Sequence, residues 1–257
     1  MALRNLGFLG RTLHRRVMRR WAHVAAHARS MPLSDLRQVR QRAVQLRHLL
    51  DRVLFAADSR LTMPYVGSNA FQKPLHSDWA YRPQLWRGPI HPPGIAAAET
   101  KTAFGDEIKL YHDCLISELT VRQLRNSREG DLAPFGLRMD VFSFDGSFLS
   151  LVIELPQEAV RGLQRRHVVR MNTIVESEHP IEIFARLNVR HGPNTEQLVR
   201  ELPLGNDEIM VEFDLAYSKL NEKRVESAWV DLIFEGPKMN QVTLRDVTFS
   251  RRPRAEL

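Results

Sequence analysis

An alternation of apolar and polar residues with a period of two runs through the second half of the chain and constrains its fold most strongly. Successive side chains of a β-strand point to opposite faces, so each such run predicts a strand with one buried face. Many short strands separated by turn residues predict a mainly β body, and we expect an antiparallel, jelly-roll-like β-sandwich. The predicted strands cover residues 107–113, 117–124, 137–142, 148–155, 167–176, 181–190, 208–215, 227–235 and 241–250.

One connection between these runs carries a strong hairpin signal. Asp145-Gly146 separates the alternating runs 137–142 and 148–155. A two-residue Asp-Gly between alternating runs is typical of a tight β-turn. We therefore expect these two strands to pair with each other in one sheet.

The alternation also assigns faces to three of the later strands. One face of each strand is apolar and predicts the core: Ile181, Ile183, Ala185, Leu187 and Val189; Ile209, Val211, Phe213 and Leu215; Ala228, Val230, Leu232 and Phe234. The opposite faces carry a set of polar and aromatic side chains that we treat as candidate ligand-binding residues: Arg186, Asn188, Arg190, Glu212, Asp214, Trp229 and Asp231.

If the three strands are neighbours, these residues form one polar sheet face with an aromatic ring. Carbohydrate recognition uses this combination, because planar charged groups bind hydroxyls and a ring covers the apolar face of a sugar. Two other interpretations stay open. The face could be solvated and crossed by ion pairs between strands, or it could be covered by the helical N-terminal segment.

Residues 62–104 change character and predict a strap without long regular elements. Repeated prolines and glycines interrupt this segment, yet its large aromatic residues include the cluster Trp79, Tyr81 and Trp86. A disordered linker has few such side chains. They are either platforms for a sugar or a partner loop, or staples that hold an extended strap across the body; both interpretations stay open.

The net positive charge of the chain comes from its first 50 residues. This segment contains eleven arginines and one acidic residue, a net charge of +10, so the rest of the chain carries −3. Apolar residues recur there every three or four positions, which predicts two amphipathic helices. We expect residues 1–61 to form a basic helical hairpin arm, followed by the strap at 62–104 and the β-sandwich domain at 105–257.

The arm can attach to an anionic membrane surface through arginines on headgroups and a tryptophan at the acyl boundary. The candidate residues are Arg11, Arg15, Arg16, Arg19, Arg20 and Trp21. Docking of the arm on the body is the alternative. Nucleic acid is a less suitable partner, because readout of bases uses Asn, Gln and aromatic residues among the basic ones. No uninterrupted apolar segment resembles a secretory signal, and we expect a cytoplasmic protein that is peripheral at the inner face of the membrane.

Motifs for catalysis and metal binding are missing from the sequence. Gly-x-Ser-x-Gly, His-Glu-x-x-His and EF-hand spacings do not occur, and a single cysteine, Cys114, excludes a disulfide framework and a cysteine-rich zinc module. We therefore expect a non-catalytic protein without cofactor or metal. A hydrolase with an unrecognised pair of carboxylates is kept as an alternative.

Two resemblances to known families follow from particular segments. The strands at Ala228–Phe234 and Gln241–Thr248 look like the closing strands of galactose-binding-like jelly rolls, which include carbohydrate-binding modules and assembly-factor domains. Through Arg82–Gly88 and Phe184–Glu196 the whole chain resembles an uncharacterised alphaproteobacterial family of unknown function. The resemblances imply a jelly-roll fold and a bacterial origin, and no residue role.

These observations predict a binding or scaffold protein. Its jelly-roll body would recognise a glycan or a protein surface, and its basic arm would attach it to a membrane surface. The alternative from another class is a membrane-peripheral assembly factor whose partner is a protein. The oligomeric state does not follow from the sequence.

Overall fold

The computed structural model describes residues 8–61, 71, 73–115, 118–128, 130–205 and 208–254. The chain divides into two compact units, Met1–Arg52 and Val53–Leu257, and each is described by itself.

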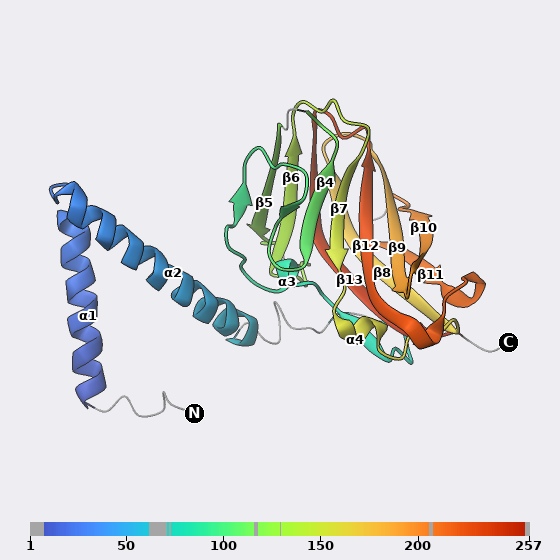
Figure 1. Cartoon of the computed structure of the whole chain (residues 1–257), viewed down its shortest axis with the longest axis horizontal. Helices are drawn as coiled ribbons and strands as arrows, with labels where there is room; N and C mark the ends of the chain where they lie inside the picture. The colour runs from blue at the N-terminus through green and yellow to red at the C-terminus, as the bar shows by residue number, and fades with distance from the viewer. Residues whose placement is uncertain are drawn as a thin grey trace. The chain divides into compact units, whose positions relative to one another are not determined.

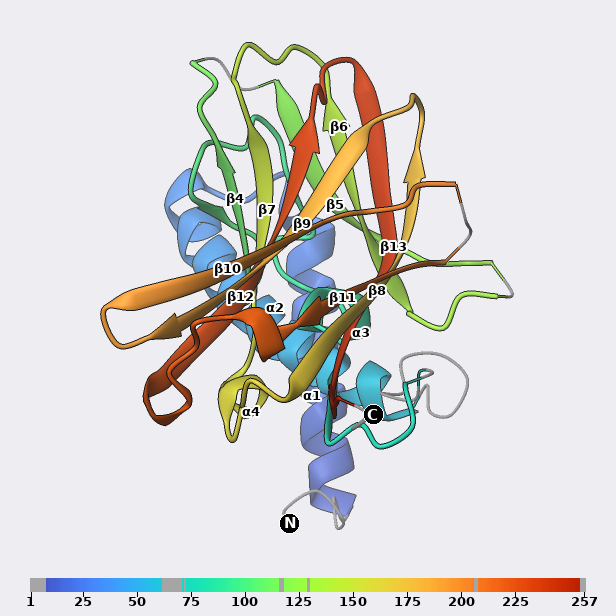
Figure 2. The ribbon, with the colours of Figure 1, turned by 90° about the vertical axis from the view of Figure 1, so that its right-hand side faces the viewer.

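The second unit is a sandwich of two antiparallel sheets (Figures 1 and 2). The seven-stranded sheet has the order β11-β8-β13-β6-β5-β2, and β1 also pairs with β13; the six-stranded sheet has the order β10-β9-β12-β7-β4-β3. The strands are β1 (Trp79–Tyr81), β2 (Gly94–Ile95), β3 (Thr102–Ala103), β4 (Ile108–His112), β5 (Leu119–Arg125), β6 (Phe135–Val141), β7 (Leu149–Glu154), β8 (His167–Ser177), β9 (Glu182–His191), β10 (Asn194–Glu201), β11 (Ile209–Asp214), β12 (Val225–Glu235) and β13 (Asn240–Pro253). Two short helices, α3 (Gln84–Arg87) and α4 (Gln157–Val160), lie in the connections.

The last eight strands follow a jelly-roll path, as predicted. The chain passes from one sheet to the other at nearly every connection, and the late strands β12 and β13 insert between earlier ones, β9 and β7 in one sheet and β8 and β6 in the other. This interleaving is the double Greek key of a jelly roll. The predicted mainly β fold with N-terminal helices is confirmed.

The predicted hairpin at Asp145-Gly146 is wrong. The two strands that it joins belong to different sheets, because β6 already lies between β5 and β13 while β7 lies between β4 and β12. A glycine is required at position 146 because the backbone there passes close to Asp113 and Cys114, and not because the chain makes a tight turn. A Cβ at this position would lie 2.4 Å from Asp113 Oδ1 and 2.9 Å from Cys114 Sγ.

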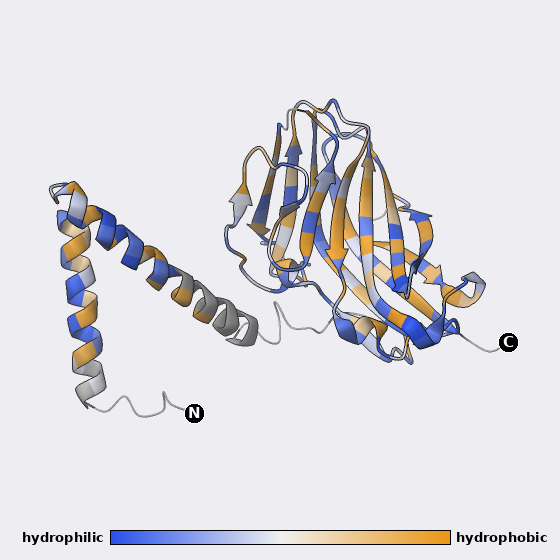
Figure 3. Ribbon diagram, in the orientation of Figure 1, coloured by the Kyte–Doolittle hydropathy of each residue, from blue (hydrophilic) through white to orange (hydrophobic). Residues whose placement is uncertain are grey.

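The core lies between the sheets and consists of the faces that the alternation assigned to it. All predicted core residues in β9, β11 and β12 and beside their ends are buried, from Ile183 and Phe213, which have no exposed surface, to Ile181 at 9%. Figure 3 shows the alternation of hydrophobic and hydrophilic residues along the strands. Both sheets bury one face against the other, which is the packing of a β-sandwich.

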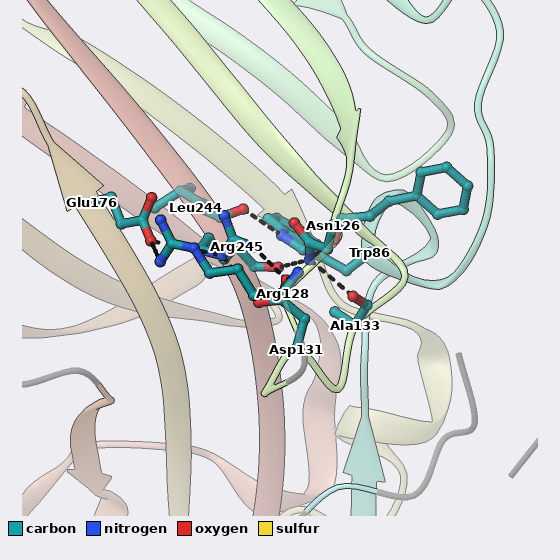
Figure 4. Close-up of polar contacts among 9 residues, drawn as sticks. Trp86, Asn126, Arg128, Asp131, Ala133, Glu176, Leu244 and Arg245 are labelled. Carbon is teal, nitrogen blue, oxygen red and sulfur yellow. Dashed lines mark hydrogen bonds and ion pairs between the residues drawn. The ribbon is translucent and has the colours of Figure 1, made fainter. Parts of the chain in front are cut away.

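The strap is part of both sheets. Its β1 and β2 extend the seven-stranded sheet and β3 extends the six-stranded one. Between the end of the β6 pairing at Leu244 and the start of the β1 pairing at Phe249, β13 has a bulge at Arg245. Side chains replace the missing strand there: Trp86 Nε1 donates to Leu244 O at 3.0 Å, and Asn126 Nδ2 donates to Arg245 O at 2.8 Å (Figure 4).

The first unit contains the helix α1 (Phe8–His27) and most of α2 (Leu33–Leu61). Apolar side chains near the turn between them, such as Trp21, Val24 and Leu36, are half-buried. Other apolar residues of the two helices are exposed, including Leu13 at 64% and Leu50 at 51%. The apolar stripes of the helices are therefore only partly covered.

Candidate functional site

A groove of about 780 Å³ lies on the outer face of the six-stranded sheet and crosses four of its strands. Its residues come from β4, from β7 and the two residues that flank it, from β12 and from β9. They are Tyr111, Phe148, Ser150, Val152, Glu154, Leu155, Arg186, Ser227, Ala228, Trp229, Asp231 and Ile233. Three aromatic side chains and several polar ones thus converge on one concave surface, which is the composition of a ligand site.

A polar network occupies one side of this groove. Arg186 and Asp231 are cross-strand partners in β9 and β12. Arg186 Nε donates to Asp231 Oδ2 at 2.8 Å, and Nη2 forms an ion pair with the same oxygen at 2.7 Å. Asn188 Nδ2 donates to the same oxygen at 3.0 Å, while Asn188 Oδ1 accepts from Gln197 at 3.0 Å. Because Asp231 is 3% exposed, these bonds fix the Arg186 guanidinium in place over the sheet.

The aromatic residues form the two ends of the groove. Trp229 lies opposite Glu154 of β7, and Tyr111 lies opposite Ser150 four residues away on the same strand. Phe148, 40% exposed, stands beside the Tyr111 end.

The segment before Phe148 is held by Asp113. Its Oδ1 accepts from the backbone N–H groups of Ser147 at 2.7 Å and Phe148 at 3.2 Å, and its Oδ2 accepts from Ser147 Oγ at 2.5 Å. The hydrogen bond from the Ser147 hydroxyl, together with those from these backbone groups, holds the pKa of Asp113 below its ordinary value. An ionised carboxylate therefore positions the backbone of Phe148 at the groove.

Ser150 adds an unused polar group. It is 6% exposed and lines the groove, and its Oγ has no hydrogen-bond partner within the described part of the chain. A buried hydroxyl without a partner costs about 1–3 kcal/mol. A ligand hydroxyl or a water bound in the groove would recover part of that cost.

The structure brings together only some of the residues proposed from the sequence. Arg186, Asn188, Trp229 and Asp231 share the outer face of β9 and β12. Arg190 lies farther along β9, outside the groove residues, where it is exposed and pairs with Glu226 at 3.3 Å.

Glu212 and Asp214 do not belong to this face. Their strand, β11, is the edge strand of the other sheet. There Glu212 is 3.4 Å from Arg252 Nη2, and Asp214 Oδ1 accepts from the backbone N–H of Ala216 at 2.9 Å. The condition that the three strands are neighbours is met by β9 and β12 but not by β11, because a core-facing alternation looks the same in either sheet of a sandwich.

The strap aromatics are held by internal contacts. Trp86 is fully buried, so it packs the core and cannot be a ligand platform. Tyr81 is half-buried, donates its hydroxyl to Glu107 and lies 5.1 Å beneath the Arg87 guanidinium. Trp79 is half-buried and stacked on Tyr81, with ring centroids 6.0 Å apart. These contacts are those of staples.

The candidate membrane residues of the arm all lie in α1. Arg15, Arg16, Arg19 and Arg20 are exposed, and Trp21 is half-buried. Arg11 belongs to α1, but its side chain is outside what the structure describes. No helix in the described ranges is long and apolar enough to cross a membrane.

The described residues contain no group of three or more His, Cys, Asp or Glu side chains that could hold a metal ion. For the hydrolase alternative, three aspartates that could supply a carboxylate are separately engaged. Asp78 pairs with Arg251 at 3.0 Å, Asp113 holds the Ser147 segment, and Asp140 pairs with Arg138 at 2.7 Å. The groove instead contains two other carboxylates, Glu154 and Asp231.

Sequence reasoning missed several groove residues, namely Tyr111, Phe148, Ser150, Val152 and Glu154. A signal for some of them was present in the alternation. Ser150, Val152 and Glu154 alternate with the core residues of β7 and so face outward, and Tyr111 does the same in β4. Only the strand order shows that β4 and β7 continue the face of β12.

The fold and the groove together define a jelly-roll β-sandwich protein with a candidate binding surface on the outer face of one sheet. Over residues 1–257 the chain matches the model of a family of unknown function, DUF6478, and it belongs to that family. The resemblance to a family of unknown function is confirmed. No curated protein matches the chain significantly.

Several solved structures are similar to parts of the chain. The family 11 carbohydrate-binding module from Clostridium thermocellum, in complex with a β-1,3-1,4-mixed-linked tetrasaccharide, is 10% identical over 63% of this chain and 97% of the module, with a TM-score of 0.39. TmCBM61 in complex with β-1,4-galactotriose is 14% identical over 65% of this chain and 98% of its own, with a TM-score of 0.34. The enzymatically active domain of tailspike protein 4 of bacteriophage CBA120 is 7% identical over 55% of this chain, with a TM-score of 0.40; the match covers 19% of that domain.

Proposed function

We propose that the protein is a non-catalytic glycan-binding protein whose site is the groove on the outer face of the six-stranded sheet. The observation that carries the proposal is the combination of three groove aromatics with the fixed Arg186–Asp231–Asn188 network. Sugar rings bind through their apolar faces on aromatic side chains and through hydroxyls on fixed charged groups.

A binding role fits the carboxylates of the groove better than a hydrolytic one. Asp231 accepts from Arg186 and Asn188, and Glu154 accepts from Lys109 Nζ. The two carboxyl groups of a hydrolytic pair must reach the scissile bond, whereas both groups here are engaged by cations or donors of the protein itself. Release of reducing ends from a bound glycan would support the hydrolase alternative.

The groove proposal is tested with a glycan array and a matched pair of variants. Phe148 and Phe142 flank the same connection and are 40% and 54% exposed, but only Phe148 lines the groove. We expect the parent protein to bind glycans, Phe148→Ala to bind about tenfold more weakly, and Phe142→Ala to bind like the parent. Loss of binding in both variants, or in neither, would contradict the site.

A protein partner is the alternative occupant of the groove, as in an assembly factor. Capture of one defined protein that Phe148→Ala fails to capture, with no binding on the array, would favour it. The two outcomes separate because the array contains no protein ligand.

We further propose that the arm attaches the protein to an anionic membrane surface, and we place it in the cytoplasm, at the inner face of the membrane. Four exposed arginines of α1 alternate with exposed apolar residues, including Val17 at 45% and Met18 at 57%. Arginine at an anionic surface contributes about 1 kcal/mol per residue, and the apolar side chains enter the headgroup boundary.

Co-sedimentation with vesicles of phosphatidylglycerol and phosphatidylcholine tests the arm. We expect binding that weakens with salt and that is lost when Arg15, Arg16, Arg19 and Arg20 are all replaced by Gln. In a control variant, Gln replaces four arginines of α2 instead: Arg37, Arg40, Arg42 and Arg47. This control should retain more vesicle binding than the α1 variant does. Equal loss in the two variants would assign the effect to total charge, and stronger binding to RNA than to vesicles would overturn the membrane proposal.

A further inference from the structure

The charged side chains at the groove are all paired. Among the residues that line it, one cation, Arg186, stands against two carboxylates, and Asp231 neutralises Arg186 at 2.7 Å. Glu154, at the Trp229 end, is paired with Lys109 of β4. A ligand with carboxylates or sulfates would have to compete with Asp231 and Glu154 for these cations, so the groove favours an uncharged ligand.

The positions of the aromatic residues set the length of that ligand. The Trp229 and Tyr111 positions are two strands apart across β7 and four residues apart along it. With strands about 4.8 Å apart and about 3.3 Å per residue, the two positions are separated by roughly 16 Å along the diagonal. A single sugar ring is not much larger than the tyrosine ring it would stack on, so one ring cannot contact both ends.

Polar groups lie beside the line between the two ends. Val152 of β7 is at its midpoint, opposite Asp231, and Ser150, whose Oγ has no partner within the described residues, is opposite Tyr111. Arg186 comes from β9, on the other side of β12 from β7, and its 35% exposed side chain reaches Asp231. A chain that rests on an aromatic ring at each end would therefore cross Val152, with the Ser150 hydroxyl near its Tyr111 end and the Arg186 guanidinium beside β12.

We propose that the ligand is an uncharged linear oligosaccharide of several units that crosses β12, β7 and β4 obliquely, with its end units on Trp229 and Tyr111. This inference rests on the proposed glycan-binding function. It adds the charge, the length and the direction of the ligand.

The test is an array that presents neutral and acidic glycans from monosaccharides to hexasaccharides. Hits should then be titrated against the parent, Tyr111→Ala and Trp229→Ala. We expect hits among neutral linear chains, no detectable binding of their monosaccharides, and affinity that rises with chain length and does not change with salt. Each variant should lose about tenfold for the long chain, and the loss from Tyr111→Ala should disappear for a disaccharide held at the Trp229 end.

Three results would overturn the inference while the proposed function stands: hits confined to acidic glycans, a monosaccharide that binds as tightly as its hexasaccharide, or a parent-like affinity of Tyr111→Ala for the long chain. Tyr111→Phe keeps the ring and should bind like the parent, and melting curves identify variants that fail to fold. Absence of any glycan hit would instead contradict the proposed function itself.

Discussion

Arg82 of the strap and Asp246 of β13 form a two-pronged, buried ion pair between the strap and the seven-stranded sheet. Arg82 Nε lies 2.9 Å from Asp246 Oδ1 and Nη2 lies 2.7 Å from Oδ2, and Arg82 has no exposed surface. The pair links residues that are 164 positions apart, next to the bulge where β13 lacks a strand partner on the β6 side. It therefore fastens the strap to the body.

Replacement of Arg82 should lower the free energy of unfolding of the sandwich. Arg82→Met leaves the Asp246 carboxylate buried without its cation, and we expect a loss of about 3–5 kcal/mol in the free energy of unfolding. Urea denaturation measures it. The control is Arg122→Met, since Arg122 is 45% exposed and 3.8 Å from Asp140, and should cost about 0–1 kcal/mol. Equal losses would show that the buried pair does not hold the strap.

The ion pair of Asp131 with Arg245, the bulge residue of β13, should make the free energy of unfolding depend on pH. Burial by itself raises the pKa of Asp131, but the hydrogen bond from Arg245 and that from the Arg128 backbone more than offset it, so the pKa lies below its ordinary value of 3.8. The folded state thus favours the ionised form. Its contribution is complete above pH 3.8 and is lost as the pH falls through the lowered pKa.

Asp131→Asn should accordingly be less stable than the parent at neutral pH and should approach the parent as the pH falls below 3.8. Urea denaturation of both proteins across this pH range gives the difference between their free energies of unfolding. Glu235→Gln, at an exposed position of β12, should give a small and constant difference. A gap between parent and Asp131→Asn that widens on acidification would reverse the predicted sign.

The sequence predicted the core because the alternation needs only local information. Each of the assigned residues of β9 and β12 faces inward, and their polar neighbours Arg186 and Asp231 meet on the outer face. Both results follow from the period of two in a strand.

The arrangement of the strands could not be predicted in the same way. Glu212 alternates like Asp231 but lies in the other sheet, and Asp145-Gly146 joins two sheets instead of two paired strands. Strand order depends on long-range pairing, which no local pattern records. For the same reason Tyr111 and Ser150 were missed, since only the pairing of β4 and β7 brings them beside Trp229.

Asp113 should affect glycan binding through Phe148. Asp113→Ala removes the acceptor of the Ser147 and Phe148 backbone groups, so the aromatic wall loses its fixed position and we expect weaker binding with an unchanged core. Titration with an array hit measures the affinity, and the melting temperature reports the fold. Asp106→Ala, at an exposed position before β4, is the control. Equal affinity of Asp113→Ala and parent would show that Phe148 needs no such support.

The groove of the six-stranded sheet is the proposed binding site, and titration of one array hit into Trp229→Ala and Arg186→Ala tests it most directly. Trp229 supplies a ring and Arg186 the fixed guanidinium, so each variant should bind at least about tenfold more weakly than the parent. The control Tyr217→Ala removes a ring that is 81% exposed outside the groove and should bind normally. If folded Trp229→Ala and Arg186→Ala bind like the parent, the groove is not the site.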